Sequence, residues 1–471
     1  MDNKDSKLGL FALIALVIGS MIGGGAFNLA TDMASGAHAG AILIAWVITA
    51  IGIITLGLSF QNLSDSRPDL DGGVFSYAKA GFGNYLGFNS AWGYWVSAFL
   101  GNVSYGALLF SSIGYFLSIF DNDHKVAQII GASVILWLVH ALVLRGVKSA
   151  AMLNAITTVA KLIPIALFIV ACIFAFKIDI FTADFWGTET FDWNNVVEQV
   201  KSTMLVTLWV FIGVEGAVVL SGRARKRSDV GKATIIGLLA TIVIYLFITL
   251  LSLGVMNQQK LAGLDAPSMA YVLEHVVGKW GAVVVNGGLV ISVLGAWLGW
   301  TLLAAEIPYI AAKDKVFPRF FAKENKNGAP IGSLLITNIC IQVFLLTFLV
   351  SDKPYNFAFS LASSAILIPY LFSAFYQVKH TFQNKKDGYI KNMVVGIVAS
   401  IYAIWLVYAG GLDYLLLTIL LYTPGIAVFA WAQKENKQKA FKTYEAVVAV
   451  IFVLIGLYAV YQLITGNIEI F

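Results

Sequence analysis

The sequence predicts an all-α integral membrane protein with about thirteen transmembrane helices. Hydrophobic residues make up 59% of the 471 positions and charged residues only 12%, whereas soluble domains average about 25% charged residues. The apolar residues also lie in long uninterrupted blocks, most of which reach the roughly 20 residues that a bilayer-spanning helix needs. Composition and block length together exclude a soluble fold.

The order of these blocks gives the order of the spans. The first block is longer than the ~7–15-residue apolar region of a signal peptide, so we predict that it stays in the protein as the first helix. The loops are short and leave no room for a soluble catalytic domain, so function is expected within the helix bundle. The predicted spans lie near residues 8–30, 40–62, 84–119, 126–144, 151–176, 196–221, 233–256, 278–312, 331–351, 355–378, 392–410, 412–433 and 443–465.

Lysine and arginine residues alternate between the two sides of these spans. The N-terminus and every second loop hold 24 of the 31, the opposite loops hold six, and Lys161 lies inside a span. Cytoplasmic loops of membrane proteins are enriched in Lys and Arg. We therefore predict a cytoplasmic N-terminus and a multi-pass protein of the cell (inner) membrane. The net charge of +5 has this topological explanation, so the lipid bilayer is expected as a partner and nucleic acid is not.

The first predicted span contains a dense glycine cluster, GSMIGGGA at positions 19–26. An interior glycine costs a helix about 1 kcal/mol relative to alanine, so the helix is expected to unwind near the membrane midplane. Unwound backbone is tolerated there where it lines a cavity or is buried in protein. Its amides, at the positive end of the following half-helix, suit a carboxylate. The alternative is close helix packing through small residues.

The sixth predicted span has a second interruption, WVFIGVEGA at positions 209–217. Paired interruptions in corresponding positions of two halves are the best sequence pointer to a transporter built from inverted repeats. The sequence therefore predicts a first repeat over residues 1–180, a second over 195–380 and additional C-terminal helices over 391–471. Because Trp209 adjoins the interruption, its ring would cover the aliphatic or cationic part of a substrate.

Three isolated charges lie inside predicted spans, namely Lys161, Glu215 and Glu306. Each costs about 2.5–3.5 kcal/mol at a helix centre if it is left unpaired, so each is a candidate for gating or coupling. Glu306 has the alternative of an interfacial position, since Lys313 and a basic loop follow within two turns. Glu215 is the preferred candidate because it adjoins the second interruption.

With these motifs the sequence resembles the amino acid–polyamine–organocation superfamily and, more narrowly, its basic amino acid/polyamine antiporters. The motifs run from residue 19 to residue 371 in the order that the family shows. The stretch 304–317 is most similar to arginine/ornithine antiporters. The matching motifs are GSMIGGG at 19–25, Gly72-Gly73 followed by Tyr94-Trp95, WVFIGVE at 209–215, GWTLLAAEIPY at 299–309 and IPYL at 368–371.

The resemblance implies a five-plus-five inverted repeat with a leucine-transporter-like core, followed by extra C-terminal helices, and a homodimer. It also implies that amides near Gly24 and Gly25 bind the carboxylate of an amino acid substrate. Carbonyl groups of Met21, Trp209 and Ile212 would then take its α-ammonium group. The substrate-binding residues implied in this way are Met21, Gly23, Gly24, Gly25, Ser97, Ala98, Asn102, Tyr105, Trp209, Ile212 and Trp300.

Within that set, the resemblance places Trp209 and Trp300 beside the substrate side chain. It implies that the pocket for the far end of that side chain is lined by Ser97, Ala98, Asn102 and Tyr105. Glu215 resembles a family acid linked to gating or proton response. Lys161 resembles a lysine whose ammonium group, in sodium-independent relatives, occupies the place of a sodium ion.

The sequence departs from the family pattern in three places. Relatives that exchange arginine for agmatine often have a serine at the positions of Gly24 and Val210, so this chain lacks two hydroxyl donors for the substrate carboxylate. The predicted thirteenth span exceeds the commoner twelve.

The leading functional hypothesis is obligate exchange of cationic amino acids, arginine for ornithine, by alternating access around the two interruptions. Both solutes carry one net positive charge, so this exchange is electrically silent. One alternative is proton-coupled uptake, with Lys161 or Glu215 carrying the proton. The other is exchange of an amino acid for its decarboxylation product, such as histidine for histamine or arginine for agmatine, which moves net charge.

Other classes fit less well. A channel requires a continuous polar stripe, whereas the polar positions here are isolated. A sensor requires a sizeable output domain, for which the loops are too short. The five histidines and two cysteines are scattered, so we predict no enzymatic activity, no metal site and no cofactor.

Overall fold

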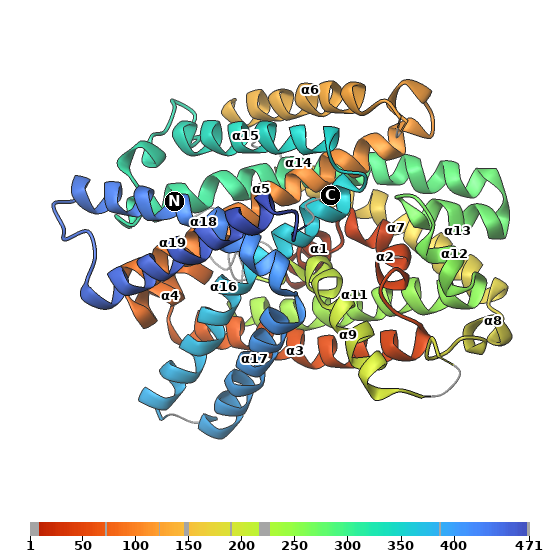
Figure 1. The fold of residues 1–471 in the computed structure, drawn as a ribbon, viewed down its shortest axis with the longest axis horizontal. Helices are drawn as coiled ribbons and strands as arrows, with labels where there is room; N and C mark the ends of the chain where they lie inside the picture. Colours follow the sequence, from red (N-terminus) through yellow and green to blue (C-terminus); the bar gives the residue numbers. More distant parts are fainter. Residues whose placement is uncertain are drawn as a thin grey trace. The chain divides into compact units, whose positions relative to one another are not determined.

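The computed structural model describes residues 9–70, 73–121, 123–145, 150–188, 191–215, 227–385 and 388–468. Within these ranges the chain is helical (Figure 1), and its only extended pairing is an isolated bridge between Glu324 and Pro330. The predicted all-α class is therefore confirmed for the described part of the chain.

A helix lies at each predicted span, and most boundaries differ from the prediction by up to about five residues; the span predicted at 196–221 is an exception, since its helix ends at Phe211, where the second interruption begins. These helices are α1 (Leu10–Met21) with α2 (Gly25–Ala34), α3 (Ala39–Ser66), α5 (Asn84–Gly114), α6 (Lys125–Leu144), α7 (Ala150–Ala175), α9 (Trp193–Phe211), α11 (Arg227–Val255), α14 (Lys279–Lys313), α15 (Ile331–Leu345) with η5 (Leu346–Leu349), α16 (Pro354–Gln383), α17 (Tyr389–Ala409), α18 (Leu412–Glu435) and α19 (Thr443–Ile464).

By length and composition, ten helices of the described ranges can cross a membrane, or eleven if α1 and α2 form one bent span. α7 adds a shorter apolar stretch, Ala160–Ala175. α9 carries Glu198 and Lys201 near its beginning and is less apolar. The multi-pass character is thus confirmed, and the number thirteen stays a prediction.

Several short helices lie in the loops, where the sequence has no long apolar block. One of them, α13, follows Pro267 and ends at Gly278, whose φ of +86° favours glycine. Its buried face packs against other helices, although its ten residues are too few to span a bilayer. The short elements are α4 (Val74–Phe82), η2 (Ser118–Phe120), α8 (Ile178–Thr182), α12 (Gln258–Ala262), α13 (Ser268–Val277) and η4 (Arg319–Ala322).

The helices form two compact units. The first comprises Met1–Gly57, Tyr105–Gln128 and Ser149–Trp297, and the second comprises Leu58–Ser104, Ile129–Lys148 and Leu298–Phe471. Helices α3, α5, α6 and α14 contribute to both. This division follows spatial packing, so it leaves the predicted repeats at 1–180 and 195–380 and the C-terminal part at 391–471 as predictions.

Within the first unit, α1 packs against α7 and α11, and α2 packs against α9, α11, α12 and α13. Within the second, α16 packs against α4, α17 and α18, and α18 packs against α19. Indole groups of the second unit hydrogen-bond inside it: Trp95 Nε1 donates to Thr337 Oγ1 at 2.9 Å and Trp92 Nε1 to the Leu421 carbonyl oxygen at 3.0 Å.

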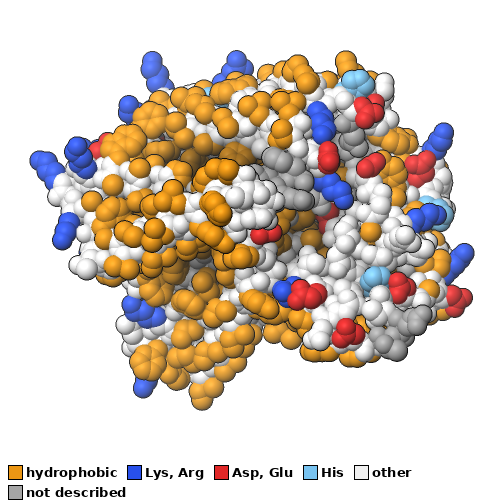
Figure 2. Space-filling view, in the orientation of Figure 1, with side chains coloured by type: hydrophobic (Ala, Val, Ile, Leu, Met, Phe, Trp, Pro, Cys, Tyr) orange, Lys and Arg blue, Asp and Glu red, His pale blue; other side chains and the backbone are white. Residues whose placement is uncertain are grey.

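Large hydrophobic side chains also cover much of the surface. Figure 2 shows them spread widely over the visible face. Phe174 of α7 is 86% exposed and Ile464 of α19 is 80% exposed. Side chains of this kind are stable at a surface that faces lipid tails, as expected for helices that lie in a bilayer.

Candidate functional site

The first helix is interrupted where its glycine cluster lies. α1 ends at Met21, α2 begins at Gly25, and the two helices are bent by 47° relative to each other. Ile22 has a φ of −74° and a ψ of 88°, outside the helical region. The predicted interruption is confirmed, and the regular helical pattern of hydrogen bonds ends at Ile22: the Gly23 amide donates to the Met21 carbonyl oxygen at 2.8 Å instead.

Two aromatic side chains lie directly on this interrupted backbone. A Cβ atom on Gly23 would be 2.6 Å from the Tyr105 hydroxyl, and one on Gly25 would be 2.7 Å from Trp209 Nε1. The rings of Tyr105 and Trp209 have centroids 6.1 Å apart. Because any side chain would displace these rings, the glycines are needed for close approach as well as for the break.

Close packing of small residues, the alternative to an interruption, is therefore also present. A Cβ atom on Gly24 would be 2.5 Å from Leu108 Cδ2 and 3.4 Å from Val293 Cγ2. The two interpretations of the glycine cluster are compatible, since the helix breaks and its bare backbone packs tightly.

The second interruption lies against the first. α9 ends at Phe211, Ile212 turns to a ψ of 127°, and Gly213 has a φ of +109°. Ser20 Oγ donates a hydrogen bond to the Gly213 carbonyl oxygen at 3.0 Å. A Cβ atom on Gly213 would be 2.7 Å from the Ser20 carbonyl oxygen. Both the left-handed backbone and the close contact require glycine here.

Glu215 belongs to this second interruption. The side chain is 1% exposed, and its Oε2 atom accepts a hydrogen bond from the Gly213 amide at 3.3 Å. The carboxylate thus holds the turn that follows α9. Gly216 and Ala217 of the same motif lie outside the described residues.

Lys161 of α7 supplies the positive charge at the first interruption. Its side chain is 2% exposed, and Nζ donates to the carbonyl oxygens of Gly19 at 2.7 Å and Ile22 at 2.6 Å. The last carbonyl groups of a helix lack intrahelical partners, and a cation is favoured at that end of the helix. The ammonium group therefore pairs with two carbonyl oxygens at the end of α1.

Tyr245 of α11 connects the two interruptions and is not among the residues that the sequence predicts for the site. Its hydroxyl oxygen lies 2.9 Å from the Met21 carbonyl oxygen and 2.9 Å from the Val210 carbonyl oxygen. The side chain is completely buried. A tyrosine hydroxyl inside the apolar span near 233–256 indicates a buried polar contact, but the sequence does not identify the partners of that hydroxyl.

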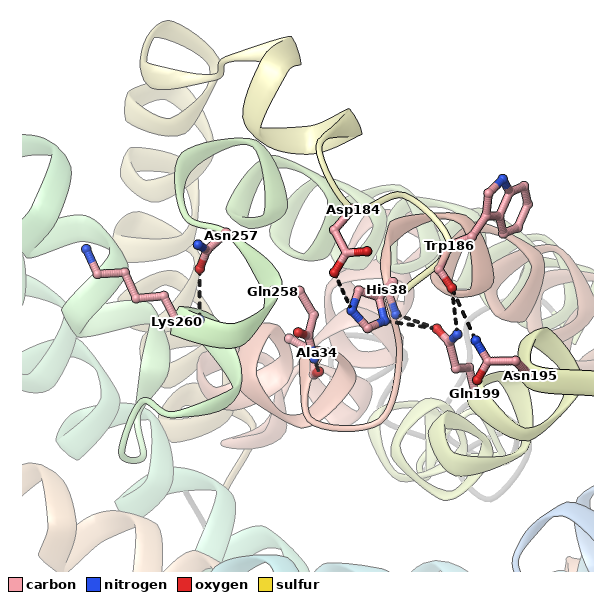
Figure 3. Close-up of polar contacts among 9 residues, drawn as sticks. All are labelled: Ala34, His38, Asp184, Trp186, Asn195, Gln199, Asn257, Gln258 and Lys260. Atoms are coloured by element: carbon pink, nitrogen blue, oxygen red, sulfur yellow. Dashed lines mark hydrogen bonds and ion pairs between the residues drawn. The ribbon is translucent and has the colours of Figure 1, made fainter. Parts of the chain in front are cut away.

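The far end of α2 is held by a separate group of contacts, which we call the α2 clamp (Figure 3). Gln258 Nε2 donates to the Ala34 carbonyl oxygen at 2.6 Å, and the His38 amide donates to Gln199 Oε1 at 2.8 Å. His38 Nε2 also lies 2.9 Å from Asp184 Oδ2. The clamp ties α2 to α12, to α9 and to the loop after α8.

Between the interruption and the α2 clamp, polar side chains attach α2 to α12 and α13. Asn28 Nδ2 donates to Asp32 Oδ1 at 2.7 Å, and the Ser268 amide donates to Asn28 Oδ1 at 3.0 Å. Thr31 Oγ1 donates to the Leu261 carbonyl oxygen at 2.7 Å. α2 is thus fastened along its whole length to helices of the first unit.

Comparison with known proteins now identifies the family. A family model described as "Amino acid permease" matches residues 8–452. The chain belongs to the amino acid permease family. The resemblance to this transporter superfamily predicted from the sequence motifs is confirmed.

Curated members of the family align with this permease over nearly their full length. An "Arginine/ornithine antiporter" of Pseudomonas aeruginosa is 53% identical over 99% of both chains. A protein of the same name from Latilactobacillus sakei is 42% identical over 100% of this chain and 99% of its own. An "Arginine/agmatine antiporter" of Chlamydia caviae is 41% identical over 98% of both.

The remaining predicted residues lie in the second unit of this permease. Ser97, Ala98 and Asn102 on α5 are buried, and neither Ser97 Oγ nor either amide atom of Asn102 has a hydrogen-bond partner among the described residues. Trp300 and Glu306 on α14 are half-buried. Buried polar groups are nearly always paired, so the Asn102 amide is an available group for a polar ligand.

The ion pair formed by Lys313 bears on the alternative for Glu306. Lys313 Nζ lies 2.9 Å from Glu324 Oε1 and also contacts the Tyr309 hydroxyl. Hydrogen bonds from Tyr309 and Lys313 lower the pKa of Glu324. Lys313, the basic residue two turns after Glu306, is thus paired with Glu324, and the interfacial position of Glu306 stays a prediction.

Proposed function

We propose that this permease exchanges a cationic amino acid for a related amino acid or amine, with arginine against ornithine as the leading pair. The observation that carries the proposal is the bare backbone at Gly23 to Gly25 beneath the rings of Tyr105 and Trp209. Backbone amides donate hydrogen bonds to an α-carboxylate, and aromatic ring faces attract a cationic side chain. The names of the curated relatives support the choice of arginine and ornithine.

The substrate carboxylate is assigned to the amides near Gly24 and Gly25, with Gly23 beside them. These amides precede or begin α2, a helix of ten residues whose N-terminal end attracts negative charge. The α-ammonium group is assigned to carbonyl groups at the interruptions, those of Met21, Trp209 and Ile212. A carbonyl oxygen has two lone pairs, so an ammonium group could add to the hydrogen bonds that Met21 and Trp209 already accept.

As the family resemblance implies, the substrate side chain is assigned to Trp209 and Trp300, and its distal pocket to Ser97, Ala98, Asn102 and Tyr105. Asn102 stands three residues before Tyr105 on α5, a spacing that places two side chains on one helix face. Its unpaired amide would hydrogen-bond the guanidinium or ammonium group, and Ser97 Oγ offers a second acceptor. Ala98 and Trp300 complete this proposed pocket.

The coupling of substrate binding to the change in access is assigned to the three charged side chains inside the predicted spans. Lys161 keeps a fixed ammonium group on the carbonyl oxygens of Gly19 and Ile22, which supports exchange without a sodium ion. Glu215 holds the turn after α9 and would respond when that turn moves. Glu306 is kept as a gating candidate on α14.

Counterflow in liposomes tests the proposal. Purified permease is reconstituted into vesicles, and uptake of labelled arginine is measured with ornithine, with arginine or with no amino acid inside. Fast uptake into loaded vesicles and none into empty vesicles is the expected result. Net uptake into empty vesicles would contradict obligate exchange and favour proton-coupled transport.

Exchange of arginine for agmatine is the second candidate, favoured by the relative of that name. Arginine carries one net positive charge and agmatine two, so this exchange moves charge across the membrane. Imposing a potassium diffusion potential across the vesicles separates the candidates. Arginine–ornithine exchange is insensitive to the potential, whereas arginine–agmatine exchange follows it.

We further propose thirteen spans, a cytoplasmic N-terminus, inverted repeats over 1–180 and 195–380, and a homodimer. The alternation of Lys and Arg between loops supports the orientation. Cysteines introduced one at a time into consecutive loops and labelled from outside test it. Labelling of loops that hold the basic residues would contradict the orientation.

A further inference from the structure

A cavity lies in the first unit, apart from the interrupted helices. It has a volume of about 140 Å³ and is lined by the end of α5, the loop after it, α13 and the beginning of α14. None of its ten lining residues belongs to the site proposed above. By the proposed orientation α5 ends and α14 begins on the outer side, so the cavity faces the external solution.

The cavity wall is acidic. Asp121 and Glu274 both line it, and none of its described lining residues is lysine or arginine. Asp121 Oδ1 lies 2.6 Å from His124 Nδ1, which is exposed. Within the described ranges Glu274 has no ion-pair partner, and it is half-buried. The wall therefore carries negative charge that the neighbouring side chains do not fully neutralise.

The wall also contains an unpaired hydrogen-bond acceptor. Asn286 of α14 lines the cavity, is 1% exposed and donates through Nδ2 to the Ala282 carbonyl oxygen at 3.0 Å. Its Oδ1 atom has no hydrogen-bond partner in the described part of the chain. A buried acceptor without a partner is costly, and a ligand that donates hydrogen bonds would remove that cost.

Two phenol groups complete the wall, Tyr115 and Tyr271. Burial raises the pKa of Tyr271, and the nearby carboxylates Asp265 and Glu274 raise it further. Tyr271 therefore remains a neutral phenol at physiological pH, with a ring face that suits a cation. The negative charge of the cavity comes from carboxylates alone.

We propose that this cavity is an external binding site for the cationic end of the substrate, the guanidinium or ammonium group of a basic amino acid. Asp121 and Glu274 attract the cation, Asn286 Oδ1 accepts one of its hydrogen bonds, and the tyrosine rings cover it. A guanidinium group has five donors and suits several acceptors at once. The inference rests on the proposed function, because that function supplies the ligand.

Such a site raises the local concentration of substrate before it reaches the interrupted helices. Clefts lined by charge of one sign increase the arrival rate of oppositely charged ligands, and salt weakens the effect. Loss of the site should therefore raise the KM for external arginine without lowering the maximal exchange rate.

The test measures arginine–ornithine exchange in liposomes for a charge series at one position. Glu274→Gln should raise the external KM about threefold to tenfold at low salt, as for a half-buried charged contact. Glu274→Lys should raise it further. In both variants the maximal rate and the melting temperature in detergent should match the wild type, which separates the effect from misfolding.

Asp123 provides the matched control. It is exposed, lies two residues after Asp121 and does not line the cavity. Asp123→Asn and Asp123→Lys should leave the KM within about twofold, the range for an exposed charge. Asn286→Leu removes the acceptor without changing the charge and should raise the KM about threefold, a change that surface charge cannot produce.

The outcomes separate the two proposals. No exchange by the wild type would overturn the proposed function and, with it, the ligand assigned to the cavity. Normal exchange with an unchanged KM in Glu274→Gln and Asn286→Leu would overturn the cavity site alone. An equal KM increase in Asp123→Lys and Glu274→Lys would also overturn it, because a general surface field would then explain both.

Discussion

Two groups of contacts hold the backbone on either side of the short helix α2. Before α2, buried groups hold the interrupted backbone: Lys161 Nζ contacts the carbonyl oxygens of Gly19 and Ile22, and the Tyr245 hydroxyl contacts those of Met21 and, on α9, Val210. At the end of α2, the α2 clamp includes the pair His38–Asp184, whose side chains are 20% and 61% exposed. Both groups consist of short polar contacts, but only the first is shielded from solvent.

The two groups of contacts differ in what happens to a polar group after its hydrogen-bond or ion-pair partner is removed. Water can solvate the freed partner at the exposed end, so a surface ion pair contributes little. At the interruption, the described neighbours are helices and aromatic rings, and a carbonyl oxygen that loses its donor stays unpaired. The interruption should therefore be far more sensitive to substitution than the α2 clamp, although the distances are alike.

Lys161→Met should have the largest effect. It removes the ammonium group from the carbonyl oxygens of Gly19 and Ile22 and keeps a side chain of similar length. Breaking a buried charged contact costs about 3–5 kcal/mol, so exchange should fall at least about 100-fold. Lys260→Met, at an exposed position of α12, is the control. A Lys161→Met variant with normal exchange would remove Lys161 from the mechanism.

Gly25→Ala should have the next largest effect. Its methyl group would meet Trp209 Nε1 at 2.7 Å, and the ring or the helix must shift to avoid this overlap. Overpacking of this kind costs about 1–3 kcal/mol, which predicts at least a tenfold rise in the KM for arginine. Gly287→Ala is the matched control, because no atom lies within 4 Å of its new methyl group. Equal kinetics for the two variants would contradict close packing at the site.

Tyr245→Phe should have an intermediate effect. The ring stays, but the carbonyl oxygens of Met21 and Val210 lose the hydroxyl that joins them. An unpaired buried acceptor costs about 1–3 kcal/mol, so the exchange rate should fall about 5-fold to 100-fold. Tyr461→Phe, at an exposed position on α19, controls for loss of a hydroxyl. Unchanged exchange by Tyr245→Phe would show that the two interruptions work without this link.

Asp184→Asn should have the smallest effect. An exposed ion pair contributes roughly 0–1 kcal/mol, so the exchange rate should change less than about fivefold at low salt. The change should vanish at high salt, where screening has already removed the attraction. Asp179→Asn on the nearby α8 is the control. A loss as large as that of Lys161→Met would contradict the contrast between the two ends of α2.

The sequence predicted the features that depend on local chemistry. A glycine cluster weakens any helix, so the break between Met21 and Gly25 could be placed from residue types alone. A lone lysine in an apolar block is costly, which made Lys161 a candidate before its partners were known. Those partners, the carbonyl oxygens of Gly19 and Ile22, could be identified only from the structure, because they depend on how α7 packs against α1.

The features that the sequence missed depend on contacts between distant segments. Tyr245 meets Met21, which is 224 residues away, and one tyrosine in an apolar helix has no spacing that points to such a partner. The acidic cavity joins Asp121, Glu274 and Asn286 from three segments. Its helix α13 is too short to produce an apolar block. Single residues in separate loops become a site only after folding.

The position of the Tyr245 hydroxyl has a consequence for an empty carrier. A phenol has a single hydrogen to donate, yet its oxygen stands at the same 2.9 Å from acceptors on both broken helices. At any instant the hydroxyl hydrogen is donated to only one of these two oxygens, although the Met21 oxygen also accepts from the Gly23 amide at 2.8 Å. An ammonium group bound at Met21, as proposed above, would leave the hydroxyl hydrogen to the Val210 oxygen, so substrate binding would change the link that Tyr245 makes between α1 and α9.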